Sequence, residues 1–347
     1  MKIKLIGLTF VGLVVLAAGL IGCTATNTVA GSAGVTDPSH TPSNNDLSAA
    51  SYVGVDNCKT CHASEYAEWK ASGHSSVIRG GASSNPSSGC GFCHATGYKQ
   101  TGGYGLASNS TTEAGMYTVQ CEMCHGPGSL HAAGPATTNI NKVPNAVTTC
   151  GRCHRGRPFV VKDANGRYDS LVDMDNKAVV NATIEAALPT SGTATRHPLH
   201  YRPNLPVFKG TGGYEYSGST YTSSFHTTGI SNACVVCHLQ FGTDKHDLEP
   251  DPAACNSCHT GVTTFDVDGK NTEILGLLQT LGGKLASYEA VVTRSARTAE
   301  SYTKALWNFY LITRETDAGA ACAGVHNYRY AKQLLQDSIN NFDPNNP

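Results

Sequence analysis

The sequence has little charge of either sign, and this shortage excludes some kinds of function. Asp, Glu, Lys and Arg together make up 15% of the 347 residues and balance to a net charge of −1. No block of Lys or Arg occurs after the N-terminus, which argues against a nucleic-acid partner. Apolar residues reach only 40% and glycine occurs 37 times, so few leucines and valines are available for a conventional core.

Long apolar runs are also absent, except for one at the N-terminus. Lys2 and Lys4 precede the run LIGLTFVGLVVLAAGL, as in a secretory signal. The letters LIGC at 20–23 resemble a bacterial lipoprotein box, in which Cys23 becomes the lipidated first residue. We interpret residues 1–23 as a signal peptide and expect an exported outer-membrane lipoprotein that faces the periplasm or the cell surface. A retained transmembrane anchor is the alternative.

Composition divides the rest of the chain into four regions. Residues 24–50, rich in Ser, Thr, Ala and Gly, predict a flexible tether. Residues 51–160 contain four copies of a short cysteine motif, and the loop-rich region 161–265 contains two more. In 266–347, apolar residues at helical spacing predict three helices. The expected fold class is therefore mainly α, with much irregular coil and little β-structure.

The stretch between the fourth and fifth motifs has a weak secondary-structure pattern. From Arg155 to Asn232 the chain is rich in Gly, Tyr, Thr and Pro and shows no sustained helical period. Within it, GGYEYSGSTYTSS at 212–224 predicts a loop or a short hairpin.

Cysteine is abundant, and its spacing is regular. Fourteen cysteines are too many for a reducing compartment unless a cofactor occupies them. Twelve of them form six Cys-x-x-Cys-His units: CKTCH at 58–62, CGFCH at 90–94, CEMCH at 121–125, CGRCH at 150–154, CVVCH at 234–238 and CNSCH at 255–259. Cys23 and Cys322 remain, and we assign no role to Cys322.

Cys-x-x-Cys-His is the attachment motif of haem c, in which two thiols form thioethers and the histidine binds iron. We predict six covalently bound haem c groups. The thioether cysteines are Cys58, Cys61, Cys90, Cys93, Cys121, Cys124, Cys150, Cys153, Cys234, Cys237, Cys255 and Cys258. The proximal iron ligands are His62, His94, His125, His154, His238 and His259. Zinc sites or disulfides could also use paired cysteines, but they leave the recurrent histidine unexplained.

The second axial ligand of each iron decides between electron transfer and catalysis. Methionine is too scarce to serve six irons, because only Met116 and Met174 lie outside the signal and the haem units. Histidine is sufficient, and the predicted distal ligands are His74, His131, His200, His226, His246 and His326. His197 competes with His200 for one position, and His40 lies in the tether.

Several motifs resemble the multihaem c-type cytochromes related to the tetrahaem electron carriers of ammonia oxidisers. They are YVGVDNCKTCHASEYAEWKASGHS, CGFCHATGY, VQCEMCHGPGSLH, HYRP with GTGGYEY, SNACVVCH and GVHNYRYAKQLL. The resemblance implies that His74, His131 and His326 are distal ligands. The lysine-ligated CxxCK unit of related nitrite reductases is absent, which disfavours that activity. In VQCEMCHGPGSLH, the Gly-Pro-Gly turn predicts that His131 reaches a haem other than the one held by His125.

These observations predict an electron carrier rather than a catalyst, without catalytic residues. Its expected partners are other redox proteins, or a periplasmic or extracellular acceptor in anaerobic respiration. Two alternatives remain open: a reductase or oxidase of a small nitrogen or sulfur compound with one open haem, and a subunit of a cytochrome filament.

Overall fold

The computed structural model describes residues 45–76, 90–105, 116–143, 145–162, 164, 168–188, 199, 202–239, 245–292, 299–314 and 324–346. The signal segment with Cys23, His40, His197, His200 and Cys322 lie outside the described residues. Within the described part of the chain, no helix combines the length and the apolar character needed to cross a membrane.

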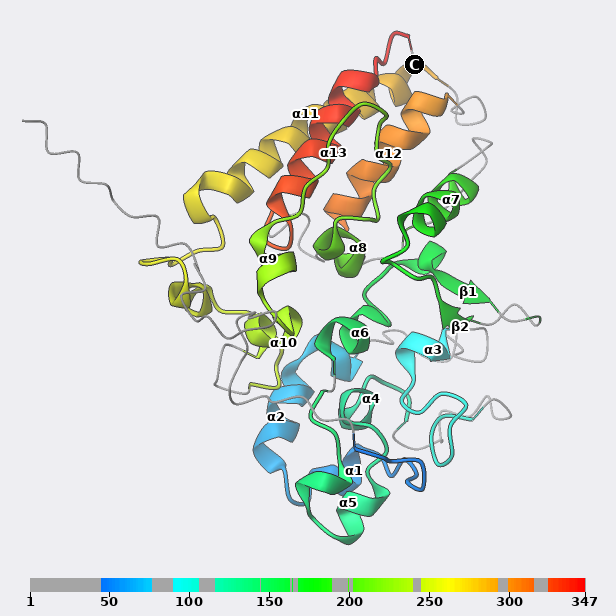
Figure 1. Cartoon of the computed structure of the whole chain (residues 1–347), viewed down its shortest axis with the longest axis vertical. Helices are drawn as coiled ribbons and strands as arrows, with labels where there is room; N and C mark the ends of the chain where they lie inside the picture. Colours follow the sequence, from blue (N-terminus) through cyan, green and yellow to red (C-terminus); the bar gives the residue numbers. More distant parts are fainter. Residues whose placement is uncertain are drawn as a thin grey trace, which may run out of the picture.

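The described chain is mainly helical, with much irregular coil, as the sequence predicts (Figure 1). The first half contains α1 (Val55–Cys58), α2 (Ala63–Ala71), η1 (Gly73–Ser76), α3 (Gly91–His94), α4 (Cys121–His125), α5 (Ser129–Ala133), η4 (Thr137–Asn139), α6 (Ala146–Gly151), η5 (Arg157–Phe159), β1 (Val160–Lys162) and β2 (Tyr168–Leu171). The second half contains α7 (Lys177–Ala187), α8 (Asn204–Lys209), α9 (Phe225–Gly229), α10 (Ala233–His238), η6 (Pro252–Ser257), η7 (Val267–Gly269), α11 (Lys270–Val291), α12 (Glu300–Thr313) and α13 (Tyr328–Asn341).

Three helices at one end of the molecule confirm the prediction for the C-terminal region. Figure 1 shows α11, α12 and α13 side by side at the top. In α11, buried side chains recur every three or four residues, which gives the helix one apolar face: Ile274, Leu278, Leu281 and Leu285. In α12, Trp307 is fully buried and its indole Nε1 donates a hydrogen bond to the carbonyl of Gly212, 2.9 Å away. The bundle therefore forms most of the large apolar core.

The region from 155 to 232 departs from the sequence prediction in two places. Residues 177–187 form helix α7, which buries Val180 and Ile184 at an i, i+4 spacing. Two buried positions are too few to produce a sustained apolar period in the sequence, so this helix was not predicted. The hairpin lies at β1 and β2, where Val160 pairs with Leu171 in antiparallel register. Residues 212–224 form an irregular loop, one of the two structures predicted for them.

The opposite end of the molecule carries α1, α2, α4 and α5 (Figure 1). Its apolar clusters are small. One groups Phe92, Ala95, Tyr98, Tyr104 and Met116, and another groups Val143, Ala146, Val235 and Leu239. Much of this end is therefore organised by short helical turns and the loops that connect them, and these turns contain the cysteine units.

Candidate functional site

Each Cys-x-x-Cys-His unit begins as a single helical turn. In the first unit, the backbone N–H of His62 donates to the carbonyl of Cys58 at 3.0 Å. The same i to i+4 bond closes the units that end at His94, His154 and His259. Residues at i, i+3 and i+4 share one face of a helix, so both thiols and the imidazole project from the same side of the turn. That arrangement is the one a c-type haem requires.

Thiols of different units lie next to one another. Three pairs of thiols from different units interact with each other: Cys58 with Cys121, Cys93 with Cys153, and Cys150 with Cys234. All six of these cysteines are nevertheless free thiols. Close approach without a disulfide leaves the sulfurs available for thioethers.

Cys258 differs from the other eleven motif cysteines. It is disulfide-bonded, whereas the eleven others are free. Its partner therefore lies outside the described residues. Because a sulfur in a disulfide cannot form a thioether, haem attachment at Cys258 stays a prediction that requires this disulfide to be reduced first.

Five of the six proximal histidines lie opposite a predicted distal histidine. The pairs are His62 with His131, His74 with His154, His125 with His246, His226 with His259, and His238 with His326. Their ring centroids are separated by 6.1, 6.1, 6.2, 6.2 and 6.4 Å, in that order. The sixth proximal histidine, His94, is half-buried on α3, and the remaining predicted distal ligand, His200, lies outside the described residues.

The constant separation fits an iron between each two rings. A metal–imidazole bond of about 2.0 Å, plus roughly 1.1 Å from that nitrogen to the ring centre, would place the centroids of two opposite ligands about 6.2 Å apart. The interplanar angles range from 17° in His238–His326 to 87° in His226–His259. Rings in direct contact would change their separation with this angle, so a common spacer explains the constant distance better. The residues therefore fit haem iron.

The pairing crosses from one unit to another. His131 follows the unit at 121–125, yet its ring lies opposite His62 rather than His125. His226 precedes the unit at 234–238 but lies opposite His259. Each of these histidines therefore joins two units, as the sequence predicts for His131.

Hydrogen bonds at Nδ1 orient several of these rings. The Nδ1 groups of His125, His226 and His238 lie 2.8, 2.7 and 2.9 Å from backbone carbonyl oxygens. His154 Nδ1 lies 3.0 Å from the side-chain oxygen of Asn204. A ring that donates from Nδ1 presents Nε2 with a free lone pair, which is the form that binds a metal. No sequence pattern points to Asn204 as a supporting residue, because it belongs to α8, 50 residues beyond His154.

Burial favours the neutral form of four of these histidines. Burial, together with nearby Arg202, lowers the pKa of His74 to about 4. Burial and the adjacent His74 lower the pKa of His154 to about 3. Burial also lowers the pKa of His226 and of His238. Neutral imidazole is the ligand form, so these positions are prepared for iron across the ordinary pH range.

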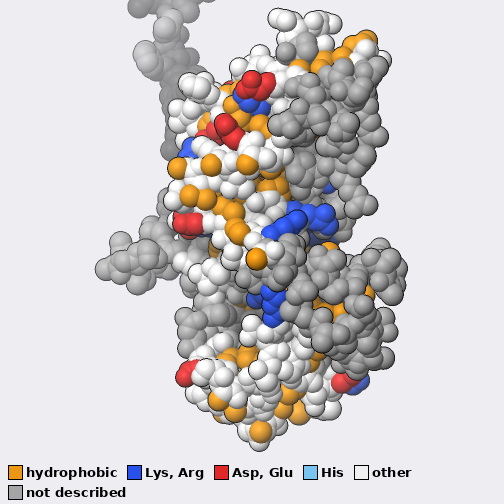
Figure 2. All heavy atoms as spheres, turned by 90° about the vertical axis from the view of Figure 1, so that its right-hand side faces the viewer, with side chains coloured by type: hydrophobic (Ala, Val, Ile, Leu, Met, Phe, Trp, Pro, Cys, Tyr) orange, Lys and Arg blue, Asp and Glu red, His pale blue; other side chains and the backbone are white. Residues whose placement is uncertain are grey.

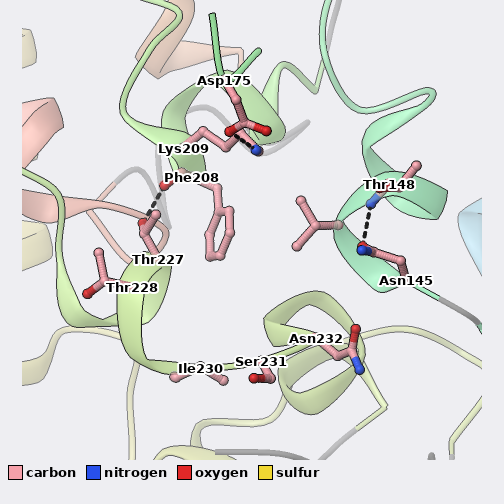
Figure 3. A pocket seen from close by; sticks show the side chains of 11 residues that line it. Asn145, Thr148, Asp175, Phe208, Lys209, Thr227, Thr228, Ile230, Ser231 and Asn232 are labelled. Carbon is pink, nitrogen blue, oxygen red and sulfur yellow. Dashed lines mark hydrogen bonds and ion pairs between the residues drawn. The ribbon is translucent and has the colours of Figure 1, made fainter. Parts of the chain in front are cut away.

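Neither the zinc alternative nor the surface pockets offer a competing site. Within the described ranges, no three His, Cys, Asp or Glu side chains gather into a metal-binding cluster. An open pocket of about 560 Å³ lies between α6, α8, α9 and α10, and Figure 3 shows its lining. Its one lysine, Lys209, forms an ion pair with Asp175, and the lining contains neither histidine nor cysteine. The pocket lining therefore offers no histidine or cysteine ligand for iron.

Comparison with known protein families finds a similarity over part of the chain. Residues 57–126 match the family model described as cytochrome c554 and c-prime. This match supports a multihaem c-type cytochrome that binds haem covalently. No curated protein matches the chain. A solved structure, the outer cell wall cytochrome OcwA, is 15% identical and aligns over 84% of this chain and 99% of its own, with a TM-score of 0.32.

Proposed function

We propose that this chain is an exported hexahaem cytochrome that transfers electrons along a chain of bis-histidine haems. The observation that carries the proposal is the set of five histidine pairs, all separated by 6.1 to 6.4 Å. When bound, haem supplies a one-electron iron couple. Two histidines would hold each iron, as the five described pairs allow, and this ligation would leave no position for a substrate and favour electron transfer over catalysis.

Contacts between units support a spatial order for the centres. The unit at 58–62 contacts the unit at 121–125 through Cys58 and Cys121. The latter unit interacts with the unit at 150–154 through Cys124 and Cys153. From there, the contact between Cys150 and Cys234 leads to the fifth unit.

The remaining two units attach to this row. Cys237 of the fifth unit interacts with Cys255 of the sixth. The unit at 90–94 joins at the fourth unit, through the contact between Cys93 and Cys153. We propose a row of five centres with one branch, in which the unit at 150–154 is the junction.

The N-terminal sequence supports the proposed location. The apolar run that ends in LIGC favours export and lipidation at Cys23, and the polar stretch 24–50 favours a tether between the lipid and the folded region. Cys23→Ser should abolish incorporation of a labelled fatty acid and release the protein from membranes. A variant that stays labelled would contradict the lipoprotein proposal.

The haem count is tested by mass spectrometry of the denatured protein. Covalent haem survives denaturation, so the protein should carry six haem masses, and Cys58→Ser with Cys61→Ser should carry five. A reductive titration should then reduce all six haems, and reoxidation should reverse the change completely. A wild-type protein with fewer than six haems would contradict the hexahaem proposal.

A further inference from the structure

Glu122 is a buried carboxylate inside one of the haem units. It is the second residue of CEMCH and only 2% of its surface is exposed. Its oxygens accept hydrogen bonds of 2.7 to 3.1 Å from the backbone N–H groups of Val53, Gly54 and Gly128. These donors offset the desolvation of the carboxylate without cancelling its charge. The charge interacts electrostatically with Cys58 and Cys121, the touching thiols of two units.

Two further carboxylates lie beside ligands of the same two units. Glu65 Oε2 is 4.0 Å from His62 Nδ1. Glu68 Oε2 is 4.0 Å from His246 Nδ1 and also accepts the backbone N–H of His246 at 2.8 Å. Both carboxylates belong to α2, one turn apart. Three carboxylates, Glu122, Glu65 and Glu68, therefore lie beside the Cys58–Cys121 pair of units.

Arginine takes the corresponding place in the next pair of units. Arg155 is 5% exposed, and its Nε and Nη1 donate to the carbonyls of Gly151 and Val172 at 2.6 and 2.9 Å. Carbonyl acceptors satisfy the guanidinium without neutralising it. Arg155 interacts electrostatically with Cys93 and Cys153, the touching thiols of this pair.

Other cations lie in the same region. Arg152 also interacts with Cys93 and Cys153, and Arg202 interacts with His74 and His154. On the surface, Figure 2 shows Lys and Arg side chains gathered near the middle of one face. Three guanidinium groups, those of Arg152, Arg155 and Arg202, therefore interact with cysteines or histidines of the Cys93–Cys153 pair of units.

We infer that these opposite charges set a gradient of reduction potential, with the Cys58–Cys121 pair of centres low and the Cys93–Cys153 pair high. The inference rests on the proposed electron-transfer function. A nearby anion stabilises the more positive oxidised iron and lowers the potential, whereas a nearby cation raises it. Burial strengthens both effects, because water and salt screen a buried charge poorly.

The gradient gives the transfer a direction. With haem bound at both pairs of units, one electron would pass from a reduced centre held by the Cys58–Cys121 pair to an oxidised centre held by the Cys93–Cys153 pair. No proton moves and no bond forms or breaks in this step. An external reductant therefore supplies electrons at the α1 and α2 end of the molecule.

The test is a spectroscopic redox titration of the six-haem protein and its charge variants. Glu122→Gln should shift about a third of the haem absorbance change, two centres of six, to higher potential. At a fixed potential we expect about a tenfold increase in the ratio of reduced to oxidised haem at those centres, which equals about 59 mV. Arg155→Gln should lower the midpoint potential of the highest-potential haems. Arg155→Lys, which keeps the positive charge, should titrate like the wild-type protein.

Exposed charges next to the same units provide matched controls. Asp56→Asn, whose side chain is 73% exposed, and Arg157→Gln, on an exposed residue of η5, should leave the titration unchanged. If Glu122→Gln fails to fold, Glu68→Gln on the half-exposed face of α2 should produce a smaller upward shift.

Two failures are distinguishable. A wild-type protein without six reducible low-spin haems contradicts the proposed function. A six-haem protein in which Glu122→Gln and Arg155→Gln leave the midpoints unchanged, or shift them in the opposite directions, overturns the gradient alone.

Discussion

His131 shows how one residue can connect two haem units. It lies on α5, just after the unit that contains His125, and its Nδ1 lies 3.1 Å from the carbonyl of Ala136. This contact turns the ring toward His62, at a centroid distance of 6.1 Å. Gly126, in the turn between the unit and α5, has φ +76°, a conformation that glycine adopts without strain. The chain can therefore leave one unit and supply a ligand to another.

His131→Met should change the potential of the centre at His62. Methionine in place of one imidazole raises the potential of a haem, and we expect a rise on the order of 0.1 V at one centre of six. A redox titration measures the rise. The assignment comes from repeating the substitution in protein that lacks Cys58 and Cys61, where the shift should disappear.

The same titration distinguishes the contrary pairing, in which His131 serves the unit that contains His125. If the shift persists without Cys58 and Cys61 but disappears when Cys121 and Cys124 are removed, His131 serves its own unit. His131 would then not connect two units.

At the scale of single residues, the sequence predicts the cysteines and histidines of the site better than it predicts which histidines lie opposite each other. The motif specifies proximal histidines by covalent spacing, which is local. Distal pairing depends on contacts between distant segments, as when His74 of η1 meets His154 beyond α6. No local pattern encodes such contacts. The charges of Glu122 and Arg155 were visible in the sequence, but their burial was not.

Among the elements, the α11–α13 bundle supplies most of the large apolar core. Trp307 of α12 is fully buried in this core, where its ring meets Phe159 edge to face at a centroid distance of 6.3 Å. Trp307→Ala should lower the free energy of unfolding by about 3–5 kcal/mol. Urea unfolding followed by far-UV circular dichroism measures this loss.

The matched control is Leu275→Ala in α11, because Leu275 is 40% exposed and its loss leaves no buried cavity. A Trp307 variant as stable as this control would contradict the account of the bundle core.

Glu273 of α11 and Lys332 of α13 make the bundle sensitive to acid. The ion pair of 2.6 Å with Lys332, and a hydrogen bond from Tyr328, lower the pKa of Glu273. A carboxyl with a lowered folded-state pKa stabilises the protein above its unfolded pKa of about 4.3, and this contribution is lost as the pH falls through the folded value.

Glu273→Gln should therefore destabilise the protein by less than about 1 kcal/mol at neutral pH, since both partners are partly exposed. The difference from wild type, measured by urea unfolding, should be constant above about pH 5 and shrink toward pH 3. Glu185→Gln, on the exposed side of α7, is the control. A difference that grows in acid would contradict the assigned direction of the pKa shift.

Long helices are predicted from the sequence pattern, whereas helices with few buried positions and short strands are not. The 22 residues of α11 repeat their apolar face often enough to predict the helix. Helix α7 buries only Val180 and Ile184, and the hairpin uses strands of three and four residues, so neither has a long pattern. Their positions depend on packing around Phe159, which is fully buried beside both.

At the scale of the whole molecule, the six units interact through their cysteines, in the proposed row of five with one branch. The α11–α13 bundle lies at one end of the molecule. Charged residues are scarce in the sequence, yet a buried carboxylate, Glu122, lies beside one pair of units and a buried guanidinium, Arg155, lies beside another. The sequence specifies the number of units, and the fold specifies their order. Together they support the proposed conduction of electrons in a preferred direction.

The central claim is that every iron has two histidine ligands. Electron paramagnetic resonance of the fully oxidised protein tests it most directly, because bis-histidine iron is low-spin and iron with an open position is high-spin. The account predicts six low-spin centres per chain, and no change on addition of cyanide. An integrated high-spin signal of one iron per chain, abolished by cyanide, would contradict it and indicate a haem open to substrate.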